Sequence, residues 1–143
     1  MRILIDTNIL IDIDRGEPEA IELMEALTEK GADMFISTIT ISEFLTGIFI
    51  QEQTKKSQII NGRELLSQFK YTALDPQIAE IAGERIARRM KNELLIEYQD
   101  EIIASTAIFL KADFLLTNNK KHYTEMPETK IVDAKELIKT IKK

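Results

Sequence analysis

Hydrophobic residues along the chain form short continuous runs, separated by longer stretches in which they recur at helical spacing. The runs are rich in isoleucine, leucine and phenylalanine, and they lack alternating polar positions. A run of this kind is typical of a strand that is buried on both faces of a sheet. The sequence therefore predicts five strands, at residues 2–5, 34–40, 71–74, 113–117 and 130–132.

Between these runs, apolar residues recur every three or four positions, as in amphipathic helices. Pro18 stands near the start of one such stretch, and Asp75 followed by Pro76 supplies an N-cap and a first-turn proline for another. Asp133 with Glu136 three residues later predicts a capping box before the C-terminal helix. The predicted helices cover residues 18–30, 42–53, 56–69 and 100–111, and two more begin at 75–76 and at 133.

The alternation of strands and helices predicts an α/β fold with a parallel sheet of four to five strands, covered by helices on both faces. The length of 143 residues suits one domain. No repeat, low-complexity segment or proline- and glycine-rich linker interrupts the chain. We therefore expect a single domain over residues 1–143, with a helical hairpin at residues 42–69 as part of it.

The composition excludes several kinds of site. The chain has no cysteine and one histidine, which rules out disulfides, thiolate zinc sites, a cysteine nucleophile and any metal site built from several histidines. No apolar run reaches the ~20 residues of a membrane span, and the N-terminus lacks the pattern of a signal peptide. We expect a cytoplasmic protein that does not associate with membranes.

Charge is distributed unevenly. Residues 1–54 contain 3 basic and 11 acidic residues, whereas residues 55–143 contain 16 basic and 13 acidic ones. A general nucleic-acid binder would be basic throughout. The acidic N-terminal third instead suggests cations as ligands, although an ordinary solvated surface fits the same composition.

Acidic residues follow the ends of the predicted strands. Asp6 ends the first strand, and Glu43 lies one helical turn beyond Thr40, the predicted end of the second strand. Asp100 opens the helix that precedes strand 113–117, which also places it at the carboxyl edge of the sheet. Ligands bind beyond this edge in open parallel sheets. Taken singly, each acid also fits an ordinary capping role.

Carboxylates that gather at one edge repel one another, and bound divalent cations relieve that repulsion. Hard oxygen ligands without histidine or cysteine select Mg²⁺ or Mn²⁺. Such a site suits phosphoryl transfer, because one ion activates water and a second, ~3.5–4 Å away, stabilises the leaving oxygen. Thr117, Asn118 and Asn119 end the strand at 113–117 and are expected to support this site.

At these residues the sequence closely resembles the PIN-domain ribonucleases and, more narrowly, the VapC-type toxins of toxin–antitoxin pairs. Four motifs carry the resemblance in order along nearly the whole chain: LIDTNILID at 4–12, ISEFLTG at 41–47, DEIIASTA at 100–107 and LTNNKKHY at 116–123. The resemblance implies a PIN-like three-layer α/β/α fold.

The resemblance also implies roles for individual residues. Asp6, Glu43 and Asp100 correspond to the acidic metal-binding triad of the family, and Thr7 or Asn8 would support it through hydrogen bonds. In many PIN domains a fourth acid lies in the last motif. Here that position is Asn119, which carries no charge.

Basic side chains are candidates for contact with an RNA backbone. Lys120 and Lys121 lie near the expected edge of the sheet, and Arg85 and Arg89 lie on the helix that begins at 75–76. A solvated helix face paired with neighbouring acids explains the two arginines equally well. His122 is a candidate for contact with phosphate or for adjusting a water molecule, but we favour an ordinary exposed histidine of a loop.

The resulting hypothesis is a Mg²⁺-dependent endoribonuclease that cleaves single-stranded or looped RNA by metal-activated water and is the toxin of a toxin–antitoxin pair. The resemblance further implies a homodimer, with the hairpin at 42–69 helping to hold an antitoxin. The alternative is a non-catalytic PIN-fold module that binds RNA or protein. The uncharged Asn119 favours this alternative, whereas the intact triad argues against it.

Overall fold

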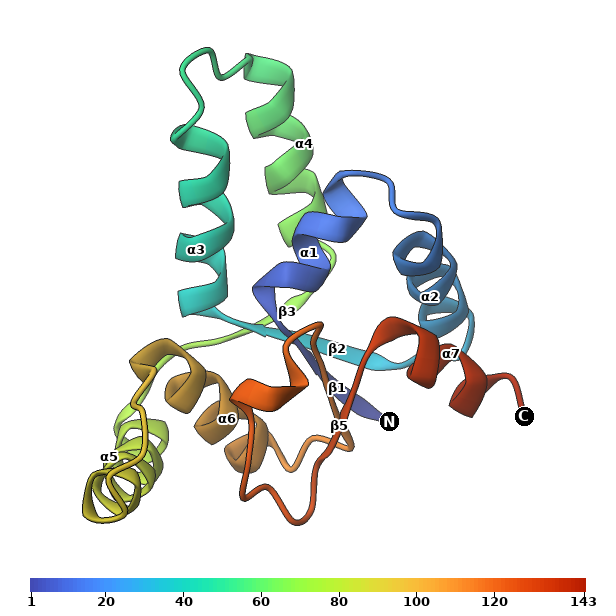
Figure 1. The fold of residues 1–143 in the computed structure, drawn as a ribbon. Coiled ribbons are helices and arrows are strands. Elements are labelled where there is room, and N and C mark those ends of the chain that lie inside the picture. The colour runs from blue at the N-terminus through green and yellow to red at the C-terminus, as the bar shows by residue number, and fades with distance from the viewer.

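The computed structural model describes residues 1–143, and a five-stranded sheet in which all neighbouring strands are parallel forms its centre (Figure 1). The strand order across the sheet is β3-β2-β1-β4-β5. The strands are β1 (Arg2–Ile5), β2 (Asp33–Ser37), β3 (Lys70–Thr72), β4 (Phe114–Leu116) and β5 (Lys130–Val132). The predicted α/β class with a central parallel sheet is confirmed.

Helices cover both faces of the sheet. They are α1 (Thr7–Asp14), α2 (Pro18–Glu29), α3 (Thr38–Phe49), α4 (Lys56–Leu66), α5 (Pro76–Lys91), α6 (Tyr98–Leu110) and α7 (Ala134–Ile141), with a 3₁₀ turn η1 at Lys120–His122. None of these helices combines the length and the apolar character that a membrane crossing requires.

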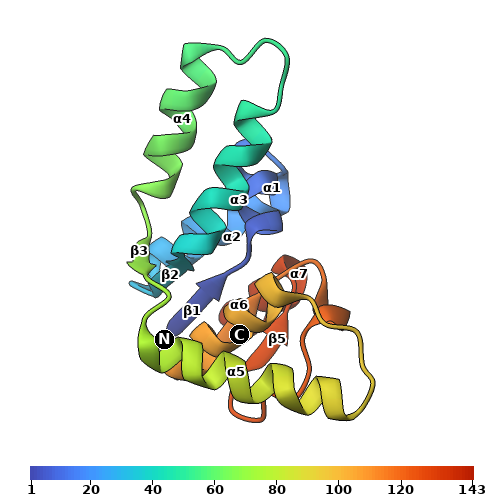
Figure 2. The ribbon, with the colours of Figure 1, turned by 90° about the vertical axis from the view of Figure 1, so that its left-hand side faces the viewer.

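The central strand β1 separates two hydrophobic cores because successive side chains of a strand point to opposite faces. Ile3 and Ile5 pack in a core with residues of α1, α2, α3, α4 and α7, whereas Leu4 packs in a second core with residues of α6 and with Tyr123. Helix α5 lies outside α6 (Figure 2). The three-layer α/β/α arrangement predicted from the sequence is therefore confirmed.

Three strands end earlier than predicted: β3 ends at Thr72 instead of residue 74, β4 at Leu116 instead of residue 117, and β2 differs most. We expected a strand over 34–40, but β2 ends at Ser37, whose Oγ accepts a hydrogen bond from the backbone N–H of Ile39 at 3.2 Å. Serine at this position is a strong N-cap, so Thr40 lies in helix α3 instead of ending a strand. The hairpin predicted at 42–69 accordingly runs from Thr38 to Leu66.

Helix α1 was not predicted. Isoleucine-rich segments favour strands, because side chains branched at Cβ are restricted in helices. In the structure the Asp6 carboxylate caps the helix by accepting from the backbone N–H of Thr7, and Ile9 and Leu10 are buried. The cap and the burial of Ile9 and Leu10 thus outweigh the preference of isoleucine for strands.

The hairpin of α3 and α4 projects from the rest of the molecule in both ribbon views (Figures 1 and 2). The two helices approach closely at Gly62, where an added Cβ would lie 2.6 Å from Cδ1 of Ile48 and 3.3 Å from the Phe44 ring. Gly83 in α5 has open space around the same position. Both glycines lie in helices but only Gly62 is crowded, so the same substitution at the two sites tests the close packing of the hairpin.

We expect Gly83→Ala to stabilise the fold by about 0.5–1 kcal/mol, because alanine has the higher helix propensity. Gly62→Ala gains the same propensity but must displace Ile48 in the core, and overpacking costs about 1–3 kcal/mol. Urea denaturation should place Gly62→Ala at least about 1 kcal/mol below Gly83→Ala. Equal stability of the two variants would show that the hairpin helices are not closely packed.

Candidate active site

Asp6 stands at the end of the central strand, buried beneath the edge of the sheet. Its Oδ1 accepts from the backbone N–H of Thr7 at 2.8 Å. Its Oδ2 accepts from the Thr117 hydroxyl at 2.8 Å, the Tyr123 hydroxyl at 2.9 Å and the Asn8 amide at 3.2 Å. Four donors from three parts of the chain therefore fix the orientation of this carboxylate.

Glu43 lies in the second turn of α3, on the other side of Thr7. Its Oε1 accepts from the Thr7 hydroxyl at 3.0 Å. Burial raises the pKa of the Glu43 carboxyl, and the nearby charges of Asp6 and Asp100 raise it further, while the Thr7 hydrogen bond opposes the rise. Thr7 thus connects two acidic groups, through its backbone to Asp6 and through its side chain to Glu43.

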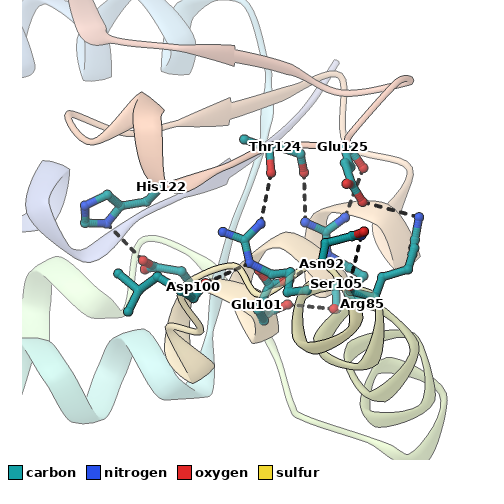
Figure 3. Close-up of polar contacts among 11 residues, drawn as sticks. Arg85, Asn92, Asp100, Glu101, Ser105, His122, Thr124 and Glu125 are labelled. Atoms are coloured by element: carbon teal, nitrogen blue, oxygen red, sulfur yellow. Dashed lines mark hydrogen bonds and ion pairs between the residues drawn. The ribbon is translucent and has the colours of Figure 1, made fainter.

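Asp100 lies in the first turn of α6. The N-cap of this helix is Glu97, so Asp100 does not serve as the cap. Its Oδ2 lies 2.9 Å from Nδ1 of His122 (Figure 3), and its Oδ1 accepts from the Tyr123 hydroxyl at 3.4 Å. Burial raises the pKa of the Asp100 carboxyl; His122 opposes this rise, and the charges of Asp6 and Glu97 add to it.

The three acids open onto one pocket of about 290 Å³, which we call the acidic pocket. They come from the end of β1, from α3 and from α6, which lie far apart in the sequence. The pocket is lined by Asp6, Thr7, Asn8, Ile11, Glu43, Glu97, Asp100, Asn119 and His122.

The side chains of the acidic pocket offer carboxylate oxygens as possible ligands of a metal ion. Hard carboxylate oxygens are the ligands that Mg²⁺ and Mn²⁺ prefer, and mutual repulsion among the acids favours a bound cation. No three acidic or histidine side chains are arranged to hold a metal ion in this conformation, and protein donors engage Asp6, Glu43 and Asp100. The residue types therefore fit a divalent cation, and binding one requires the acids to exchange some of these donors for it.

The sequence profile of the PIN domain matches residues 3–127. The chain belongs to the PIN domain family. A relative from Mycobacterium tuberculosis, named ribonuclease VapC19, is 35% identical over 126 residues, which make up 87% of this chain and 94% of the relative.

Solved structures agree with this membership. A toxin–antitoxin complex from Klebsiella pneumoniae contains a chain that is 31% identical, with a TM-score of 0.67 and coverage of 89% of this chain and 94% of that one. A chain in the structure of VapBC2 from Rickettsia felis bound to a promoter DNA fragment has a TM-score of 0.81 at 23% identity, with coverage of 93% and 98%. The second likeness concerns the fold alone.

The other polar residues predicted to support the site either contact Asp6 or hold the residues that do. Asn8 and Thr117 contact its carboxylate directly. Asn118 holds Asn8 in place, since its backbone N–H donates to Asn8 Oδ1 at 2.9 Å. The backbone N–H of Asn119 donates to the Thr117 hydroxyl at 3.0 Å, while Asn119 also lines the acidic pocket.

Sequence reasoning missed Tyr123. It follows a run of polar residues, which gave no sign of a buried position, yet its ring is 4% exposed and its hydroxyl lies between Asp6 and Asp100. Burial and the two carboxylates raise the pKa of Tyr123, so its hydroxyl stays protonated and acts as a donor. His122 is half-exposed, as expected, and its ring also contacts Asp100 in the pocket.

The basic candidates divide into two groups. Arg85 is buried and Arg89 is largely buried, and acceptors within the protein engage both guanidinium groups. The expected contact of these arginines with an RNA backbone is therefore wrong, and so is the alternative of a solvated helix face. Lys120 and Lys121 lie beside the acidic pocket, along a second hollow that shares Asn119 and His122 with it. Lys120 is exposed although it pairs with Glu136 at 2.6 Å.

The raised pKa of Glu43 predicts how the stability of this PIN domain depends on pH. A carboxyl whose pKa is higher in the folded state destabilises the fold when ionised, and this penalty disappears as pH falls through the folded-state pKa. In the presence of a chelator, Glu43→Gln should raise the melting temperature at neutral pH. This gain in melting temperature should vanish below pH 4.5, the ordinary pKa of a glutamate carboxyl.

Thermal melting at several pH values measures this effect. The control is Glu52→Gln, which removes an exposed acid between α3 and α4 that does not line the pocket. Glutamine retains an oxygen that can accept from the Thr7 hydroxyl, so the comparison isolates the charge. A Glu43→Gln variant that melts lower than the wild type at neutral pH would contradict the proposed crowding of charges.

Proposed function

We propose that this PIN domain is an endoribonuclease that cleaves single-stranded or looped RNA with the help of a divalent cation, and that it is the toxin of a toxin–antitoxin pair. One observation carries the proposal: Asp6, Glu43 and Asp100 come from distant segments and line a single pocket. The 35% identity to a protein named ribonuclease VapC19 supports RNA as the substrate class.

Asp6, Glu43 and Asp100 would hold Mg²⁺ or Mn²⁺. When bound, such an ion supplies Lewis-acid activation of water and neutralises charge on the phosphodiester. The protein contributes orientation through the hydroxyls of Thr7, Thr117 and Tyr123. These donors keep the acids near one another before any ligand arrives, which limits the rearrangement that binding demands.

The surroundings of the pocket support a flexible nucleic-acid strand as substrate. Lys120 and Lys121 lie together in the hollow beside the acids, where they can contact phosphate groups next to the cleaved bond. The acids are partly recessed, with the Asp100 side chain 21% exposed. A single strand or loop can bend its backbone toward them, whereas an A-form duplex presents a fixed shape.

An antitoxin protein is the proposed partner, and a homodimer is the proposed assembly. Similar chains occur in solved toxin–antitoxin complexes, including the one from Klebsiella pneumoniae. The α3–α4 hairpin exposes Phe49, Ile50 and Ile60, and apolar side chains of this kind mark surfaces for protein partners when they lie together. The hairpin is therefore our candidate for helping to hold the antitoxin.

The rival is a non-catalytic PIN-fold module that binds RNA or protein. Two observations favour it: Asn119 carries no charge, and no three acids are arranged to hold a metal ion in this conformation. The rival and the proposal differ in whether a cation binds at the pocket and whether RNA is cut there.

Cation binding is tested by thermal melting with and without Mg²⁺ or Mn²⁺. An ion that binds only the folded protein stabilises it by about 2.7 kcal/mol at a hundred times its Kd. We expect the wild type to melt higher with the ion, Glu52→Gln to behave like the wild type, and Asp100→Asn to lose most of the increase. Equal increases in the wild type and in Asp100→Asn would place the ion elsewhere.

Cleavage is tested by mapping the ends produced on total RNA. We expect Asp6→Asn to cut at least about 100-fold more slowly than the wild type, since loss of a partner beyond the direct metal ligands already costs about 10–100-fold. The Glu52→Gln protein, purified identically, should cut normally. Equal cutting by the wild type and Asp6→Asn would indicate a contaminating nuclease or another active site.

A further inference from the structure

A buried ion-pair network lies directly behind the acidic pocket. The Glu101 carboxylate of α6 is 3% exposed and pairs with two arginines of α5, with Nε of Arg85 at 2.9 Å and Nε of Arg89 at 3.0 Å. Glu101 is the sequence neighbour of Asp100, but its side chain points away from the pocket and into the contact between α5 and α6 (Figure 3). We call Arg85, Arg89 and Glu101 the clamp.

The clamp holds the backbone that carries His122 and Tyr123. Arg85 donates from Nη1 to the Glu125 carbonyl at 2.9 Å and from Nη2 to the Thr124 carbonyl at 2.8 Å (Figure 3). Arg89 donates from Nη1 to the Thr124 hydroxyl at 3.1 Å. The two guanidinium groups thus share the Glu101 carboxylate, and the oxygens of Thr124 and Glu125 accept three of their further N–H donors.

The held segment needs such support. Residues 123–129 connect η1 to β5 without forming a helix or strand. Within it, Glu125 adopts a φ of +56°, a left-handed backbone conformation that is unfavourable for residues other than glycine. A conformation of this kind persists only where surrounding contacts impose it. The hydrogen bond from Arg85 to the Glu125 carbonyl is such a contact.

The segment begins at Tyr123 and directly follows His122, and these two side chains touch the proposed cation ligands. Tyr123 donates to Asp6 and lies within reach of Asp100, and His122 contacts Asp100. We propose that the clamp is a positioning device, which sets His122 and Tyr123 against the acids of the pocket. This inference rests on the proposed function, since it assigns the clamp a role in the same reaction, and none of its members touches the pocket.

The test uses Arg85→Lys in the full chain. Lysine keeps the positive charge beside Glu101, but its single ammonium lacks the planar fork that reaches two carbonyls at once. The matched control is Arg88→Lys, on the same helix, because Arg88 is half-exposed and meets only the Glu125 carboxylate, at 3.4 Å. Should Arg85→Lys fail to fold, Thr124→Val removes only the hydroxyl that accepts from Arg89.

His122 is the one histidine of the chain, so its imidazole NMR signals report on the pocket without any assignment. At fixed pH and with a chelator present, we expect these signals to shift or broaden in Arg85→Lys and to match the wild type in Arg88→Lys. RNA cleavage at a temperature where each variant is fully folded should show kcat reduced about 10–100-fold, with KM changed much less.

Each outcome decides the inference. Arg85→Lys with unchanged His122 signals would overturn it, as would altered signals with unchanged kcat, because the clamp would then serve stability alone. A wild type that cuts no RNA would refute the proposed function, and the positioning of His122 and Tyr123 by the clamp would still be decided by the NMR comparison.

Discussion

The structure depends on the burial of one carboxylate at the end of its central strand. Asp6 lies where β1 meets α1, and a buried carboxylate without donors would cost more than the fold can supply. The donors come from the first turn of α1, the end of β4 and the segment after η1. Satisfying Asp6 therefore brings together the same segments that form the acidic pocket.

Crowding of acids adds a second constraint. Glu43 and Asp100 stand close enough to Asp6 that its charge raises their pKa values, and burial raises them more. A protein selected for stability alone would replace such groups, since natural proteins store strain of this kind chiefly at functional sites. The hydroxyls of Thr7 and Tyr123 reduce the cost without removing the charges.

The sequence was informative where a physical signal is local. Apolar runs and N-caps located all five strands and six of the seven helices, and Asp6 was placed at the end of its strand. Helix α1 was missed because its isoleucines favour a strand until the Asp6 cap and the core decide otherwise. The end of β2 was misplaced because Ser37, a capping residue, lies within a run of β-branched residues.

Residues whose roles depend only on tertiary contacts could not be identified from the sequence. Arg85 and Glu101 are sixteen positions apart on different helices, and in a sequence they resemble ordinary surface charges. Tyr123 likewise follows polar residues that suggest an exposed loop. Nothing short of the packing of α5 on α6, and of residues 123–126 on the sheet, distinguishes these side chains from solvated ones.

The long sequence separation between Asp6 and its donors has a consequence for the making of the protein. Asp6 is bound by Thr117 and Tyr123, which follow it by 111 and 117 positions, and β1 pairs with β4 across a comparable distance. Translation delivers residues from the N-terminus at about 5–20 per second. Until the ribosome has released the chain as far as Tyr123, β1 cannot pair with β4 and the acidic pocket cannot be complete. A nascent chain therefore stays without this pocket through most of its synthesis, and loop closure over such a span makes the final step slow.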